Sequence, residues 1–258
     1  MNGSIHSRTA WLWPALLLLA LGLVWEVWVR VSGTPLWMLP PPSAIAGSFR
    51  DDWRMLLRHT RVTLIEVVLG FGLALVAGIL TGVAIDSSSI LRRTIYPLII
   101  ASQTIPMVAL APLMLIWFGY GLMPKILITA LIGFFPIAVN TVDGLRSSDR
   151  EILSLLRAMG SNAWQRFRLV RVPSALPLIF TGARIAITFC VIGAVFGELV
   201  GASEGLGYLM TRSAAQFQTA RLFACIVILA LMGIGLFSLV ALIERRLLPW
   251  RRYLTANS

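Results

Sequence analysis

The side chains of this chain that could do chemistry are mostly polar residues inside long apolar runs. Arg184 is the clearest case, because a charged residue inside an apolar span costs free energy and is a functional hypothesis by default. Prolines interrupt two neighbouring runs, and the backbone carbonyls they free need protein or a water-filled cavity to satisfy them. We therefore predict a substrate pathway, lined by these polar residues: Gln103, Thr104, Asn140, Thr181, Arg184, Thr188 and Glu198. A structural role for Arg184, as the partner of Glu198, Glu66 or freed carbonyls, stays open.

These polar residues do not form a catalytic or metal-binding set. The apolar runs contain no paired carboxylates, no histidine cluster and no nucleophile beside a base, so a membrane enzyme is disfavoured. Cys190 and Cys225 lie inside apolar runs, where we expect them to act as small apolar residues. His6 and His59 fall outside the runs, so no imidazole pair is placed to hold haem. We expect neither a metal nor a cofactor in this chain.

The most specific signal is the basic and aromatic stretch RAMGSNAWQRFRLVRVPSALP at residues 157–177. It predicts a helix from Glu151 to Met159, a turn at Gly160, and a second helix that Ser161 caps and Pro173 ends. Trp164 and Phe167 share a face of the second helix, and arginines surround them, a composition typical of buried protein interfaces. The predicted docking surface comprises Met159, Gly160, Ser161, Trp164, Gln165, Arg166, Phe167, Arg168 and Pro173. A helix resting on anionic lipid is the alternative, although adsorption alone would not need so rigid a shape.

The elements that position these residues must be membrane helices. The 258 residues have a mean hydropathy of +0.84 and only 13% are charged, too few to cover the surface of a soluble domain. A span needs about 20 apolar residues to cross a core roughly 30 Å thick. Six runs qualify: 11–29, 62–85, 95–118, 122–142, 176–200 and 222–243. WEVWVRV, rather than a small-residue cleavage site, follows the first run, which therefore predicts an uncleaved anchor.

Arginine placement predicts the orientation of these spans. With the N-terminus in the cytoplasm, the inner segments hold thirteen arginines and the outer segments eight basic residues. The docking stretch and both termini are then cytoplasmic. This topology also explains the net charge of +11, and the scattered arginines do not form the single basic stripe that a nucleic-acid partner would require.

Three further patterns predict local structure. Between the first two spans, Ser43 is a candidate N-cap for an amphipathic interfacial helix with apolar residues from Ile45 to Leu57, and a docking surface for an outer partner is its alternative. Small residues recur every four positions in the second span and predict a close helix contact, either within one chain or between two. They are Gly70, Ala74, Gly78 and Gly82. The glycine-rich segment 197–221 predicts either an outer gate or an ordinary connector.

Residues 157–173 resemble the cytoplasmic loop shared by permease subunits of binding-protein-dependent ABC importers. That loop carries a Glu-Ala-Ala triplet, a glycine and a later Ile-x-Leu-Pro run. Gly160 matches the glycine, and residues 170–173 fill the run with conservative replacements, while the triplet positions 154–156 read Ser-Leu-Leu. The segments 104–121, 134–146, 197–209 and 244–251 are similar to the nitrate, sulfonate and taurine branch of this family, which includes relatives thought to import thiamine pyrimidine precursors or riboflavin.

The resemblance implies an all-α integral membrane protein with the type I (MetI-like) importer permease fold. It implies a single domain over 1–258, with an anchor helix at 11–29, core helices within about 62–247 and a cytoplasmic coupling loop at 145–173. Expected partners are the lipid membrane, a second permease copy, an extracytoplasmic binding protein and cytoplasmic ATPase subunits that hold ATP and Mg. In the family, the second short helix of the loop docks on the ATPase, and the solute crosses the bacterial inner membrane by alternating access.

Two other classes without an ATPase partner remain as alternatives. A secondary transporter is expected to show two repeated halves, and no convincing internal repeat is found in this chain. A channel-type helical protein fits the composition but does not account for the docking stretch. The cargo stays open between a sulfonate, taurine, nitrate and a thiamine-pyrimidine-like precursor.

Overall fold

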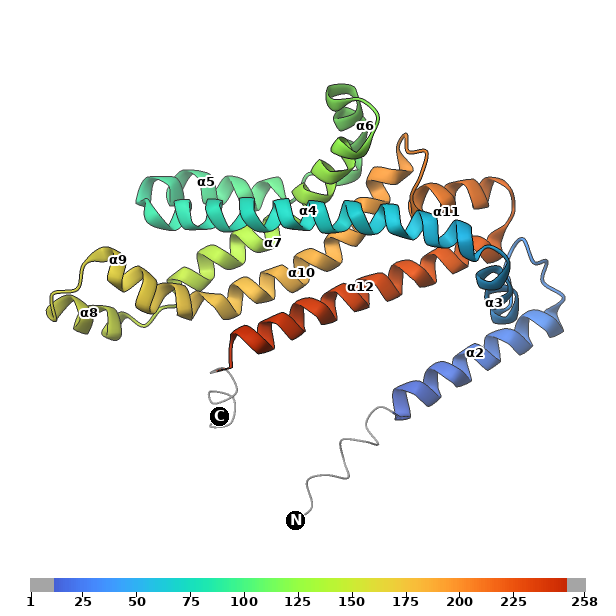
Figure 1. Cartoon of the computed structure of the whole chain (residues 1–258), viewed down its shortest axis with the longest axis horizontal. Coiled ribbons are helices and arrows are strands. Elements are labelled where there is room, and N and C mark those ends of the chain that lie inside the picture. The colour runs from blue at the N-terminus through green and yellow to red at the C-terminus, as the bar shows by residue number, and fades with distance from the viewer. Residues whose placement is uncertain (1–11, 250–258) are drawn as a thin grey trace, which may run out of the picture.

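The computed structural model describes residues 12–249, which fold into helices joined by short connections (Figure 1). The helices are α2 (Leu12–Ser32), α3 (Pro42–Asp51), α4 (Trp53–Ser87), α5 (Ser89–Ser102), α6 (Met107–Phe118), α7 (Leu122–Arg146), α8 (Arg150–Ala158), α9 (Ala163–Arg166), the π-helix η1 (Phe167–Arg171), α10 (Val172–Leu199), α11 (Leu206–Ala215) and α12 (Thr219–Leu247). Some residues used in the sequence analysis lie outside the described residues. They are His6, Arg8, Trp11 (the first residue of the predicted anchor), Arg251 and Arg252.

Five predicted spans are confirmed as continuous helices long and apolar enough to cross a membrane. They correspond to α2, α4, α7, the continuous helical stretch Ala163–Leu199 and α12. The third predicted span, 95–118, is wrong as one helix, because residues 103–106 separate α5 from α6 and α6 turns away from the bundle (Figure 1). Pro106 adopts an extended conformation with ψ 107°. It lacks an N–H, and its ring disfavours helical geometry at the preceding residue, so α5 and α6 do not join into one helix.

The centre of the fold is a parallel contact between α4 and α7. Each of the four small residues that recur along α4 contacts the α7 residue 59 positions later in the sequence, as parallel helices do. The contact is close: a Cβ added at Gly70 would lie 2.5 Å from Thr129 Cγ2. One added at Gly82 would lie 2.6 Å from Thr141 Cβ. The seam predicted from Gly70, Ala74, Gly78 and Gly82 is therefore a contact within one chain, where small residues allow the two backbones to approach closely.

Helix α10 completes this core by running antiparallel to α7. Glycines again mark the close approaches: a Cβ at Gly182 would lie 2.7 Å from the Pro136 carbonyl oxygen, and one at Gly193 would lie 3.1 Å from Thr129 Cα. Cys190 is buried in this contact with its sulfur 3.6 Å from the Thr129 carbonyl oxygen. It acts as the small packing residue that the sequence predicted.

The N-terminal elements pack at the edge of the core. Helix α2 joins the bundle near its C-terminal end, where its Glu26 accepts hydrogen bonds from the backbone N–H and the hydroxyl of Ser43 (3.0 and 2.8 Å; Figure 1). The predicted N-cap role of Ser43 is therefore wrong, and Pro41 holds that position. The predicted interfacial helix is also divided, because α3 ends before Asp52 and a new helix, α4, begins after it. Both carboxylate oxygens of Asp52 bind Arg221 of α12 (2.7 and 2.9 Å), which holds the break in place.

Candidate functional site: a coupling loop at one end and a polar network at the other

The loop after α7 forms the predicted helix-turn-helix. Helix α8 ends in a Schellman motif, in which Ser161 N–H donates to the Leu156 carbonyl and Gly160 N–H to the Arg157 carbonyl (both 3.0 Å). Gly160 has φ +82°, in the left-handed region that only glycine adopts without strain. The turn that the sequence assigned to Gly160 is therefore fixed by backbone geometry.

The second helix begins one residue later than predicted. Asn162, and not Ser161, is the N-cap: its side chain accepts from Gln165 N–H, and Gln165 accepts in return from Asn162 N–H (both 2.8 Å). This capping box satisfies two donors that would otherwise be free at the helix start. Gln165, predicted as a docking residue, therefore fixes the shape of α9 through its side chain.

The predicted stop at Pro173 is also wrong. The chain stays helical from Ala163 to Leu199, and the π-helix η1 lies just before Pro173, so the helix continues past the proline. Val172 N–H reaches back five residues to the Phe167 carbonyl, which widens the helix just where Pro173 lacks its own N–H. Helix α9 and the core helix α10 are therefore one continuous element, and Pro173 lies at its internal joint.

Helices α8 and α9 form one tip of the molecule, and the predicted docking residues lie in this tip and in the helical turns that follow it (Figure 1). Trp164 is 65% exposed and stacks on Phe167 with ring centroids 5.7 Å apart. Met159 is 74% exposed, and Arg168 is also exposed, whereas Arg166 folds back onto the Ser161 carbonyl. Large apolar side chains left uncovered beside positive charge have the composition of a protein interface.

An ion pair that the sequence did not predict ties this loop to the core. Arg171, in η1, contacts Asp86 at the end of α4 (2.5 Å) and donates to the Leu145 carbonyl of α7 (3.3 Å). The Asp86 side chain is only 2% exposed. Asp86 directly follows a predicted span, and Arg171 lies in the predicted loop. Their pairing could not be predicted, because 85 residues separate them and helical periodicity reports only local contacts.

At the opposite end of the core, buried polar groups join α4, α7, α10 and the connector before α11. Glu198 accepts from the Thr63 hydroxyl and from Gly207 N–H (both 2.6 Å), and Leu206 N–H donates to the Thr63 hydroxyl (2.9 Å). Next to them, Lys125 pairs with Glu66 at 2.8 Å. Glu198 is 1% exposed, and its bonds hold the first turn of α11 against the core. Lys125 also donates to the Glu204 carbonyl (3.4 Å), which holds the 200–205 connector in place.

Arg184 pairs with Glu244, and not with Glu198 or Glu66, the two carboxylates that the sequence left open as partners. Its Nε lies 3.2 Å from Glu244 of α12, and its guanidinium lies 5.8 Å from the centre of the Phe237 ring. Its contact with Thr181 is 3.5 Å long. The side chain remains 27% exposed, so the structural contact with α12 does not bury it completely.

The remaining predicted pathway residues are only partly brought together. Thr181, Arg184 and Thr188 follow one stripe of α10, and Asn140 of α7 packs against Gly182 of the same helix. Asn140, Thr181 and Thr188 direct their side chains to carbonyls one turn earlier in their own helices. Gln103 and Thr104 are exposed at the break between α5 and α6. Glu198 is fourteen residues from Arg184 along α10, or about 21 Å of helix, and lies outside this group.

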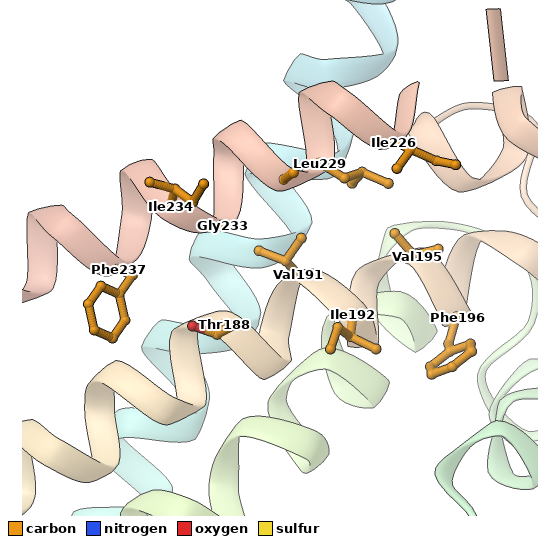
Figure 2. Close-up of a pocket in the computed structure, with 11 residues that line it drawn as sticks. Thr188, Val191, Ile192, Val195, Phe196, Ile226, Leu229, Gly233, Ile234 and Phe237 are labelled. Atoms are coloured by element: carbon orange, nitrogen blue, oxygen red, sulfur yellow. The ribbon is translucent and has the colours of Figure 1, made fainter. Parts of the chain in front are cut away.

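An apolar groove of about 590 Å³ lies between α10 and α12 (Figure 2). Thr188 supplies the one side-chain oxygen of the lining residues that Figure 2 draws, and Phe237 lies near it on the facing helix. Over the described residues 12–249, no group of three or more histidine, cysteine or acidic side chains is placed to hold a metal ion. The geometry therefore provides a rigid loop, a joined helix core and an apolar surface.

Comparisons with known proteins place this geometry in a family. Residues 74–249 match the family model described as binding-protein-dependent transport system inner membrane component. The formylaminopyrimidine transport permease protein ThiX of Halalkalibacterium halodurans is 43% identical over 93% of this chain and 96% of its own length. The riboflavin transport system permease protein RibX of Chloroflexus aurantiacus is 38% identical over 95% of this chain and 94% of its own length. The taurine transport system permease protein TauC of Escherichia coli is 32% identical over 97% of this chain and 97% of its own length.

A solved structure shows the same fold. A chain of the inward-facing MetNI methionine ABC transporter matches with a TM-score of 0.64 at 22% identity, over 77% of this chain and 96% of that chain. The predicted type I importer fold and the predicted branch of the family are both confirmed.

Proposed function

This chain belongs to the family of inner membrane components of binding-protein-dependent transport systems, and from that premise we propose how it couples a partner ATPase to solute import. It is the permease subunit of an ABC importer in the inner membrane, and ATP is hydrolysed on a partner subunit rather than on this chain. Its role is to convert motion of the ATPase into opening and closing of a path for a small solute.

Helix α9 is the docking element in this proposal. The observation that carries it is the unbroken helical connection from Ala163 to Leu199, because a push on α9 then moves α10 as one body. Trp164, Phe167 and Met159 supply the apolar contact, and Arg168 supplies charge at its rim. Gly160 and the capping box fix the angle of α9 relative to α8, so a partner meets a preformed shape rather than a flexible loop.

The Arg171 ion pair extends the same motion to the other core helices. It joins η1 to α4 through Asp86 and to α7 through the Leu145 carbonyl. The three helices that contact one another in the core are therefore also connected at the end where the ATPase docks. Rocking of such a rigid group is the kind of rearrangement that alternating access requires.

We propose that the α8–α9 end is cytoplasmic, so that α2 begins and α12 ends on that side. The arginine bias of the sequence supports this orientation. The test uses two exposed positions at opposite ends that lie outside the docking surface, Leu155 (61% exposed) and Leu36 (64% exposed). A Leu155→Cys variant is expected to react with an impermeant maleimide only after the cells are opened, and a Leu36→Cys variant in intact cells. The reverse pattern would overturn the orientation.

We propose further that two copies of this chain form the path together. The polar stripe of α10 carries an exposed Thr188 and a partly exposed Arg184, and Gln103 and Thr104 are exposed at the α5–α6 break. Polar side chains facing lipid are costly, whereas the same side chains facing a second copy across a water-filled path are not. The expected species in mild detergent is a permease pair with two ATPase subunits. A single permease copy per active complex, measured by mass photometry, would contradict this.

For the cargo, we propose a small heteroaromatic compound of the formylaminopyrimidine class. The 43% identity to a permease of that specificity exceeds the 32% identity to the taurine permease. Arg184, the basic residue that would suit a sulfonate, already faces Glu244 at 3.2 Å, so an anion would have to compete with that carboxylate. In vesicles with the cognate ATPase and binding protein, formylaminopyrimidine is expected to stimulate ATP hydrolysis and taurine is not. Stimulation by taurine alone would reject this assignment.

A further inference from the structure

A strongly basic pocket of about 400 Å³ lies between the α8–α9 loop and the adjoining ends of α4, α5 and α7. Its lining gathers arginines from five separate elements: Arg92 of α5, Arg146 of α7, Arg150 and Arg157 of α8, Arg166 of α9 and Arg171 of η1. The one carboxylate in the lining is Asp86, and it is engaged by Arg171. The excess of arginine on the cytoplasmic side accounts for basic residues in this region, but not for their convergence on a single pocket.

Most of these arginines have no acidic partner among the residues that the structure describes. Among residues 12–249, no carboxylate lies within 4.0 Å of the guanidinium of Arg92, Arg146, Arg150 or Arg157. Two nearby acidic residues make other contacts: the Asp149 side chain caps α8, and Asp143 accepts from the Tyr96 hydroxyl at 3.1 Å. Guanidinium groups of like charge repel one another, and a bound anion would relieve that repulsion.

The chemistry of the pocket selects the anion. A guanidinium forms two parallel hydrogen bonds to a phosphate, and several guanidinium groups arranged around one point can bind all its oxygens. Arg146, Arg150 and Arg157 are also exposed on their outer side, so a ligand can reach them. Basic pockets beside membrane helices on the cytoplasmic side are typical sites for the phosphates of lipid headgroups.

We propose that this pocket binds a phosphate-bearing anion, supplied either by an anionic lipid headgroup or by a soluble phosphate. The bound phosphate would bridge α5 and α7 of the core to α8 and α9 of the loop. It would thereby hold the loop against the core next to the Arg171–Asp86 pair, and its presence would stiffen the connection. The site is independent of the cargo and of the permease pair.

The test compares the full chain with the variant Arg150→Gln/Arg157→Gln, purified in detergent. The matched control is Arg245→Gln/Arg246→Gln, which removes the same charge from exposed positions in the last turn of α12. One arm adds dioleoylphosphatidylglycerol or dioleoylphosphatidylcholine and counts retained lipid by native mass spectrometry. The other arm adds inorganic phosphate alone and follows its ³¹P line width.

The pocket variant is expected to bind the phosphate probe at least about tenfold more weakly, because two charge-assisted contacts are removed, while the control stays close to wild type. Retention of phosphatidylglycerol with no response to inorganic phosphate would identify the lipid as the source, and a phosphate response would identify the soluble anion. If neither probe prefers the wild type over the pocket variant, or if the control loses as much, the proposal is wrong. Loss of ATPase association without any loss of phosphate binding would likewise overturn it and assign the arginines to an acidic protein partner.

A second variant distinguishes loss of phosphate binding from misfolding. Arg157→Lys keeps the charge and the long side chain but loses the planar fork, and it leaves the fold contacts of Arg171 and Arg166 intact. It is expected to elute as a single species and still to bind the phosphate probe several-fold more weakly than wild type. Unchanged binding by this variant together with the double variant would exclude the pocket as a phosphate site.

Discussion

Replacement of Asp86 by asparagine is expected to uncouple ATP hydrolysis from transport while leaving the ATPase docked. The Asp86 side chain is 2% exposed and faces Arg171, which is 28% exposed and keeps its second contact with the Leu145 carbonyl. Breaking a fully buried pair costs about 3–5 kcal/mol. Since Arg171 reaches solvent and the amide preserves one acceptor, we expect a cost of about 2 kcal/mol.

This stability cost also sets the size of the functional effect. A coupling free energy of about 2 kcal/mol corresponds to a factor of about thirty between the two conformations, so solute carried per ATP hydrolysed is expected to fall by about tenfold and by no more than about thirtyfold. The measurement is uptake into vesicles alongside ATP hydrolysis in the same sample. Co-purification of the ATPase is expected to stay at the wild-type level, because Asp86 is not part of the docking surface.

The matched control is Asp52→Asn, which weakens the comparable Asp52–Arg221 pair at the opposite end of the core (2.7 and 2.9 Å). It is expected to lower the thermal midpoint similarly without changing transport per ATP. The exchange Asp86→Arg/Arg171→Asp is expected to recover part of the coupling. The reasoning is refuted if Asp86→Asn transports normally per ATP, or if Asp52→Asn uncouples just as strongly.

Four further single substitutions and one double variant test the helix packing, the Gly160 turn and the buried Lys125–Glu66 pair by thermal unfolding in detergent. Gly78→Ala places a Cβ 2.8 Å from Ile137 and is expected to cost about 1–3 kcal/mol, whereas Gly72→Ala meets open space and is expected to be neutral or slightly stabilising. Gly160→Ala meets open space but has φ +82°, so a cost of about 1–2 kcal/mol is expected from backbone strain alone. Lys125→Met strands the buried carboxylate of Glu66 and is expected to cost about 3–5 kcal/mol, most of which Glu66→Gln in the same chain should restore. Equal midpoints for the two alanine variants of α4, or no recovery in the double variant, would contradict the packing described here.

Much of the fold was predictable from residue spacing. The glycine seam of α4 follows a helical period, so it indicated close packing before its partner helix was known. The loop turn was equally local, because Gly160 fixes it without help from distant residues. Two features with a short sequence range, the α4 seam and the Gly160 turn, were therefore predicted, whereas the N-caps assigned to Ser43 and Ser161 were wrong. The docking role of the exposed α9 side chains stays a prediction.

Long-range partners and the behaviour of prolines were not predictable. Arg171 finds Asp86 across 85 residues and Arg184 finds Glu244, and only the packing of the helices decides those pairs. Pro106 is the N-cap of α6 in the break after α5, whereas Pro173 lies inside a continuous helix beside the π-helix η1. The sequence predicted the opposite, a continuous span through Pro106 and a helix end at Pro173. The difference depends on whether neighbouring elements hold the widened turn, as Arg171 does for η1.

The most direct test of the coupling proposal is whether the exposed face of α9 holds the ATPase. Trp164→Asp and Leu169→Asp place a charge at similarly exposed positions of the same helical stretch, 65% and 64% exposed, but on different faces of the helix. Wild type and Leu169→Asp are expected to co-purify a stoichiometric ATPase, and Trp164→Asp is expected to insert normally without it. Full retention of the ATPase by Trp164→Asp would show that this face of α9 is not the docking surface.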